Sequence, residues 1–125
     1  MTRVVAEVSP PNSIVLIMDD SVGVVPDLAE GRVGANSTCV AIGTLAQCDG
    51  TTRIELTDEE PGEVAGSEVA FDGVILTPSK RLSVRSAHDE ALLEIDVPTE
   101  ATRLRIWAND RNEPDGILVW ARGGR

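Results

Sequence analysis

Nine short apolar segments separated by turn residues are the feature that most constrains the fold of this chain. Glycine and proline punctuate them, as at Pro10-Pro11, Asp49-Gly50 and Pro61-Gly62. Short strands at such spacing, without a helical stripe, predict an all-β fold: an antiparallel two-sheet β-sandwich of eight to nine strands. The predicted strands are Val4–Val8, Ser13–Met18, Thr38–Leu45, Arg53–Leu56, Val69–Leu76, Arg81–Ser86, Ala91–Val97, Thr102–Ala108 and Ile117–Ala121.

The 125 residues match the length of one domain, and we expect residues 1–125 to form a single sandwich with a flexible tail at about 122–125. An apolar content of 42% is too high for a disordered chain. Phe71, Trp107 and Trp120 are the only aromatic residues, so aliphatic side chains must fill the core. The longest early apolar run, Ile14–Met18, is too short for a signal peptide or a membrane span, which predicts a cytoplasmic protein.

The strongest local prediction is a hairpin over Ala91–Ala108. A four-residue loop at its centre sets Asp96 opposite Arg103 and Glu94 opposite Arg105. The same register pairs aliphatic residues on the other face, and a slip of one residue would bury the charges. The pattern therefore predicts that these two strands are neighbours in one sheet.

Gly73 interrupts the strand predicted over Val69–Leu76. A glycine inside a strand marks a β-bulge or the close approach of another group. The apolar positions change phase in this segment, which fits one extra residue on the strand.

Negative charge is concentrated in one part of the chain. The window from Asp49 to Asp72 carries −7 of the net charge of −10. Such a field disfavours nucleic acid and anionic membranes, and it favours a basic protein or a cation. The window has one basic residue, Arg53, and its acidic residues are Asp49, Glu55, Asp58, Glu59, Glu60, Glu63, Glu68 and Asp72.

Within this window, Asp58, Glu59, Glu60, Glu63 and Asp72 are the candidate partner-binding residues. A basic enzyme such as a nuclease, whose cleft normally holds phosphates, would be steered toward their carboxylates. The alternative is a loop whose charges only keep it in water.

Trp107 is the remaining candidate for partner binding. It lies on the outward face of its strand beside Arg103 and Arg105, and Trp120 shares the parity of Leu118. Tryptophan and arginine are enriched among the residues that dominate binding energy. The structural alternative is that a second sheet or the arginine stems cover the ring.

No catalytic residue, metal ligand or cofactor is predicted. His88-Asp89-Glu90 has the composition of an exposed turn, without an identifiable nucleophile. Cys39 and Cys48 would form a disulfide only if Ser37–Leu45 and Thr51–Leu56 paired, and a reducing compartment argues against it.

The chain also resembles a loose family of small bacterial β proteins typified by competence protein J, a nuclease inhibitor. The pattern departs from its relatives at Thr99, Glu100 and Leu104. The resemblance implies a β-sandwich and an inhibitor-like binding role. It lies in Ile14–Asp19, Val40–Thr44, Phe71–Leu82, Val97-Pro98, Arg103–Trp107 and Trp120.

Together these patterns predict a small acidic protein-binding module, inhibitor- or immunity-like, that occludes a basic partner such as a nuclease. The alternative is a sandwich that binds a small ligand or a cation without catalysis, through Asp19-Asp20 and Asp110–Asp115. A monomer and a dimer formed through an unpaired edge strand are both open.

Overall fold

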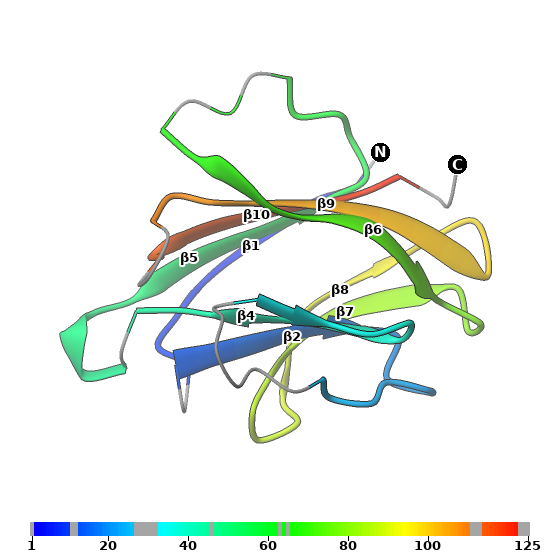
Figure 1. Ribbon diagram of the computed structural model, residues 1–125, viewed down its shortest axis with the longest axis horizontal. Coiled ribbons are helices and arrows are strands. Elements are labelled where there is room, and N and C mark those ends of the chain that lie inside the picture. The colour runs from blue at the N-terminus through cyan, green and yellow to red at the C-terminus, as the bar shows by residue number, and fades with distance from the viewer. Residues whose placement is uncertain are drawn as a thin grey trace.

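The computed structural model describes residues 2–10, 13–26, 33–45, 47–62, 64, 66–110 and 114–122. Two five-stranded sheets pack face to face as a β-sandwich (Figure 1). The expected fold class is confirmed, with one strand more than the upper number predicted. The strands are β1 (Arg3–Val8), β2 (Ile14–Met18), β3 (Val33–Ala35), β4 (Cys39–Gly43), β5 (Thr52–Thr57), β6 (Glu68–Leu76), β7 (Arg81–Ser86), β8 (Ala91–Asp96), β9 (Ala101–Ala108) and β10 (Gly116–Ala121), with a short 3-10 helix η2 (Gln47–Asp49).

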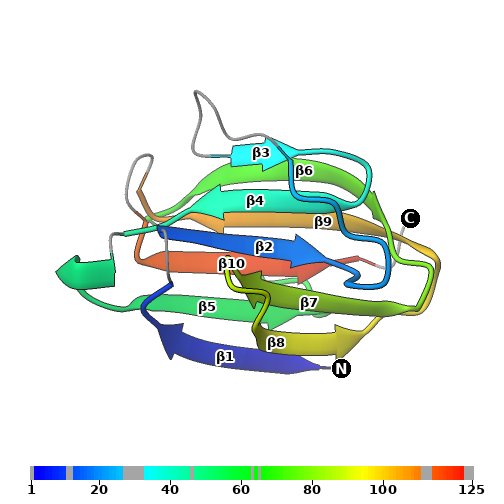
Figure 2. The same cartoon turned by 90° about the horizontal axis from the view of Figure 1, so that it is seen from below.

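Sheet A has the strand order β1-β5-β10-β9-β6, and sheet B has the order β3-β4-β2-β7-β8. Neighbouring strands are antiparallel except β5 and β10, which are parallel. Figure 2 shows β6 and β3 along one side of the sandwich and β1 and β8 along the other. Each sheet therefore has two edge strands.

The core between the sheets is aliphatic. Alternate residues of each strand point inward, and the largest of them are at most 1% exposed. Each fully buried side chain of this size contributes about 2 kcal/mol through its removal from water. They include Ile17, Val40, Ile42, Ile54, Leu56, Ile75, Leu82, Leu104, Ile106 and Val119.

Each of the nine predicted segments contains a strand. The unpredicted strand is β3, which has only three residues, Val33, Gly34 and Ala35. Three residues with a central glycine are too few to show alternation.

The predicted hairpin over Ala91–Ala108 is wrong. Strand β8 pairs with β7 in sheet B, whereas β9 lies between β10 and β6 in sheet A. The chain crosses between the sheets after Val97. Buried Thr77 fixes this crossing, because its Oγ1 donates to the carbonyl oxygen of Thr99 at 2.9 Å and lies 2.8 Å from Oγ1 of Thr102.

Strand β6 contains the predicted irregularity, but not at Gly73. The register with β9 shifts between Val69 and Phe71. Gly73 is instead a close approach, since an added Cβ would lie 2.8 Å from Cζ of Phe71.

None of the helices in the described part of the chain is long and apolar enough to cross a membrane.

Candidate functional site

Two cross-strand rows define the outer face of sheet A, the side turned away from sheet B. The first row runs through Val5, Glu55, Leu118, Trp107 and Val69, one residue from each strand. The sequence prediction that Trp107 points outward is confirmed, although its neighbours are Leu118 and Val69. Trp107 is partly exposed and lies on the face turned away from sheet B, so sheet B does not cover it.

Trp120 of β10 lies in the second row, also on the outer face, and is paired with Arg105 of β9. The Trp107 and Trp120 rings stack with centroids 6.4 Å apart and planes at 20°. Cζ of Arg122 lies 4.6 Å from the centroid of the Trp120 ring, a cation–π distance. These contacts leave Trp120 only 8% exposed, whereas Trp107 presents part of its ring to solvent.

Glu55 lies on this face between two arginines. Its carboxylate is 2.8 Å from Nε of Arg3 and 3.4 Å from Nη1 of Arg53, and its side chain is only 11% exposed. This carboxylate therefore has its charge compensated within sheet A.

Asp72, one of the predicted partner-binding residues, lies in an equivalent arrangement. Its carboxylate is 2.8 Å from Nη2 of Arg105 and 3.3 Å from Nε of Arg103. The hydrogen bond from Arg105 is the largest of the effects that hold the pKa of Asp72 below its ordinary value, and Arg103 adds to it. Asp72 is thus ionised and already paired.

The connection between β5 and β6 carries Asp58, Glu59 and Glu60, which we call the acidic loop. Figure 1 shows this connection on the side of sheet A turned away from sheet B. Its base is fixed to Thr2, whose backbone N–H donates to Oδ1 of Asp58 at 2.7 Å and whose carbonyl accepts from Oγ1 of Thr57 at 3.1 Å.

The side chains of Glu59 and Glu60 make no ion pair with any residue that the structure describes. Glu63, also predicted to bind a partner, lies outside the described residues. Asp49 precedes β5 and Asp58 follows it, so they lie about 20 Å apart at opposite ends of this six-residue strand. The acidic window therefore does not form one surface, and the acidic loop contributes two carboxylates, Glu59 and Glu60, without an ion-pair partner among the described residues.

A shallow pocket of about 190 Å³ lies between this connection and sheet A. Arg53, Glu55 and Leu118 line it from the sheet, and Val64 and Ser67 line it from the connection. Sites for drug-sized ligands usually measure roughly 300–1,000 Å³. The pocket is thus too small to favour the small-ligand alternative.

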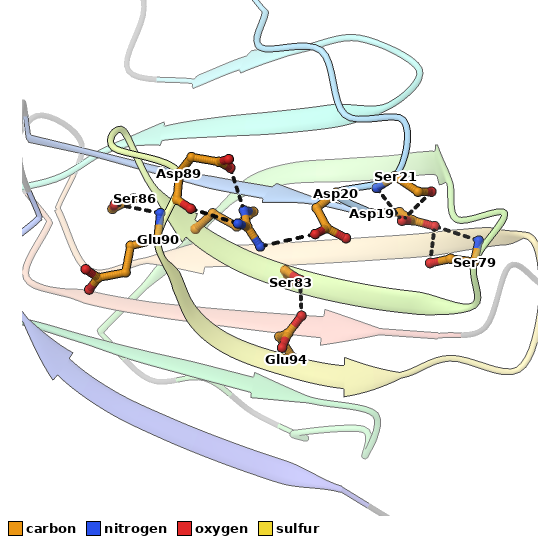
Figure 3. A network of polar contacts seen from close by, with 10 residues as sticks. Asp19, Asp20, Ser21, Ser79, Ser83, Ser86, Asp89, Glu90 and Glu94 are labelled. Atoms are coloured by element: carbon orange, nitrogen blue, oxygen red, sulfur yellow. Dashed lines mark hydrogen bonds and ion pairs between the residues drawn. The ribbon is translucent and has the colours of Figure 1, made fainter.

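The cation alternative placed its ligands at Asp19-Asp20 and Asp110–Asp115, and residues 111–113 of the second segment lie outside the described residues. Asp19 is fully buried, and its oxygens accept four hydrogen bonds at 2.7–2.9 Å from the backbone N–H and Oγ of Ser21 and of Ser79 (Figure 3). Asp20 is 3.5 Å from Nη1 of Arg85, which also pairs with Asp89. No group of three or more metal-ligating side chains occurs among the described residues.

The two cysteines are free, and the strands that would have had to pair for a disulfide belong to different sheets. Burial raises the pKa of the Cys39 thiol to about 11, while Cys48 is exposed.

We expect a maleimide to label Cys48 alone in the native protein and both thiols in denaturant, because the thiolate is the reactive form. Mass spectrometry of the labelled peptides measures this, and rapid native labelling of Cys39 would contradict the burial.

Sequence reasoning missed Glu55, Arg3 and Arg122 as parts of this face. Glu55 was counted only as one charge of the acidic window. Its position opposite Val5 and Leu118 depends on β5 lying between β1 and β10, and no local pattern shows that order.

No protein-family model matches the chain, and no curated protein matches it. Among solved structures, the chain resembles ComJ from Bacillus subtilis, an inhibitor of the DNA-degrading activity of NucA. The TM-score is 0.61 at 15% identity, over 94% of this chain and 92% of ComJ. It also resembles the product of crocagin biosynthetic gene J, with a TM-score of 0.52 at 17% identity over 96% and 98% of the two chains. The expected likeness to competence protein J is therefore confirmed at the level of the fold.

Proposed function

We propose that this protein is a binding module of the inhibitor type, which covers a basic protein such as a nuclease without catalysing a reaction. The contact surface comprises the acidic loop and the outer face of sheet A around Trp107. The observation that carries the proposal is the location of Trp107: a chain with an aliphatic core keeps this large aromatic residue partly exposed on the outside of a sheet.

The charges on this surface divide into two kinds. Glu55 and Asp72 are each held by two arginines and contribute to the rigidity of the sheet. Glu59 and Glu60 have no such partner among the described residues, and they are free to meet lysines or arginines of another protein. Complementary charges of this kind accelerate association and orient the partner.

Inhibition in this proposal is steric. A sheet face with a fixed aromatic residue forms a rigid contact, and the acidic loop occupies basic groups that would otherwise hold phosphates. The likeness to ComJ supports this role, because that protein inhibits a DNA-degrading enzyme and has the same fold over nearly its whole length.

The test is nuclease capture on the immobilised protein. We expect a basic nuclease from a native-host lysate to be retained at low salt and released as salt increases, because opposite surface charges are screened. The double variant Glu59→Lys/Glu60→Lys should weaken binding of the purified nuclease at least about tenfold.

The matched control is Glu90→Lys/Glu94→Lys, which makes the same charge change on β8 and the turn before it, in sheet B. This control should lose far less affinity. Equal losses in the two double variants would mean that only net charge matters, and capture that does not depend on salt would refute the electrostatic contact.

A further inference from the structure

The four edge strands of the sandwich are not protected equally. An edge strand exposes unpaired N–H and C=O groups, and proteins block such edges with charges, short strands or covering elements. Strand β1 carries Arg3 and Glu7 and lies against β8, which carries Glu94 and Asp96. Strand β3 has only three residues. Three of the edges therefore have a recognisable safeguard.

Strand β6 is different. It is nine residues long, and Val69, Val74 and Leu76 are 52%, 51% and 48% exposed. Between Val69 and Leu76 the one charged residue is Asp72, whose carboxylate is already paired with two arginines of β9. A long, apolar edge of this kind is a template for another strand.

The open part of the edge is short. The backbone N–H of Leu76 donates to the carbonyl oxygen of Ser37 at 2.8 Å, so the backbone groups of Leu76 point away from β9. Because direction alternates along a strand, those of Asp72 and Val74 point the same way. The register shift between Val69 and Phe71 ends the regular edge on the other side.

We propose that a second copy of this chain occupies this edge, with the two β6 strands antiparallel about a two-fold axis at Gly73. Asp72 then lies opposite the partner's Val74 and Val74 opposite the partner's Asp72. Each of these pairs exchanges two backbone hydrogen bonds through the groups that point outward. Sheet A continues through both copies as one sheet.

Two neighbouring registers fail. An axis at Asp72 sets Val74 opposite the partner's Ala70, the residue that the register shift leaves out of the ladder, and so loses the hydrogen bonds of Val74. An axis at Val74 requires the N–H of Leu76, which Ser37 already holds. With the axis at Gly73, Leu76 lies opposite the partner's Ala70, the bulge residue, which needs no place in the ladder.

Gly73 also suits the axis position. Residues facing each other without ladder hydrogen bonds approach to about 4.5 Å between Cα atoms. Gly73 has no side chain there, and the ring of Phe71 fills the space beneath it. Because only a short stretch of each edge takes part, we expect the interface to bury less than about 1,200 Å² in total, the range of weak interfaces. The dimer should therefore depend on protein concentration. It leaves Trp107 accessible and does not rest on the proposed function.

The experiment is sedimentation of the purified protein from low-micromolar to near-millimolar concentration. The wild type should shift from monomer to dimer. Val74→Pro removes an N–H that β9 does not use, and proline is tolerated at such edge positions. We expect it to weaken dimerisation at least about tenfold. Val74→Thr keeps both the N–H and the branched shape, so this control should dimerise like the wild type.

Hydrogen exchange supplies a second measurement that does not depend on any variant. The amides of Asp72 and Val74 should exchange more slowly as protein concentration rises, while the amide of Val5, on β1, should not change. A wild-type monomer at every concentration would overturn the proposal. A dimer that forms equally well with Val74→Pro, or without protection of these amides, would also overturn it.

Discussion

Replacement of Asp19 by alanine is expected to lower the free energy of unfolding by about 3 kcal/mol, because it removes a buried, charged acceptor of several hydrogen bonds. The carboxylate accepts four hydrogen bonds, two from Ser21 and two from Ser79. It thereby joins the end of β2 to the turn between β6 and β7 (Figure 3). Urea denaturation at neutral pH measures the loss.

The same carboxylate predicts the acid response of the protein. Burial acts to raise the pKa of Asp19, but the hydrogen bonds from Ser79 and Ser21 outweigh it and lower the pKa from its ordinary value of 3.8. A depressed pKa stabilises the fold fully above the unfolded value and ceases to do so as pH falls through the folded value. The wild type should therefore lose stability below about pH 4, and Asp19→Ala should lose less over that range.

Asp49→Ala is the control for this experiment, since Asp49 is an exposed aspartate outside the network. It should change the free energy of unfolding by less than about 0.5 kcal/mol. If Asp19→Ala were as stable as this control, the hydrogen bonds of Asp19 would not be what attaches the end of β2 to the β6–β7 turn.

The alternation of apolar residues predicted which face of each strand is buried. Leu104 and Ile106 are fully buried, while Arg103, Arg105 and Trp107 point outward, as the sequence indicated. This succeeds because a period of two residues is a property of the strand itself. It does not depend on the neighbouring strand.

The identity of the neighbour could not be predicted in the same way. Glu94 and Asp96 complement Arg103 and Arg105 in sign, but Asp96 pairs with Arg81, and Ser83 donates to Glu94. Both sheets face one core, so the connection after β8 can cross the sandwich without changing which side chains are buried. The hydrogen bonds of Thr77 and Thr102 hold the connection at this crossing, and these threonines carry no pattern in the sequence.

The candidate surface was predicted in part for the same reason. The sequence located the acidic loop and the outward Trp107, since both follow from local composition and parity. It also counted Asp72 and Glu55 as free negative charge. Asp72 is paired by arginines of β9 and Glu55 by Arg3 of β1, besides Arg53 of its own strand, so most of their compensation depends on strand order.

Trp120→Ala is expected to cost about 3 kcal/mol of stability, whereas Trp107→Ala should cost only about 1 kcal/mol. The two rings stack, but Trp120 is 8% exposed under Trp107 and Arg122, and Trp107 is partly exposed. Removing the covered ring leaves a cavity on sheet A, while removing the covering ring mainly uncovers its neighbour. Urea denaturation followed by circular dichroism compares the two variants without depending on tryptophan fluorescence.

The comparison separates a structural aromatic residue from a binding one. If Trp107 is an anchor for a partner, Trp107→Ala should lose at least about tenfold in affinity for the captured nuclease at a small cost in stability. Trp107→Phe should recover part of that affinity, because a smaller ring still packs against Trp120. A loss of stability as large as that of Trp120→Ala would instead assign Trp107 to the fold, and the contact would then rest on the acidic loop alone.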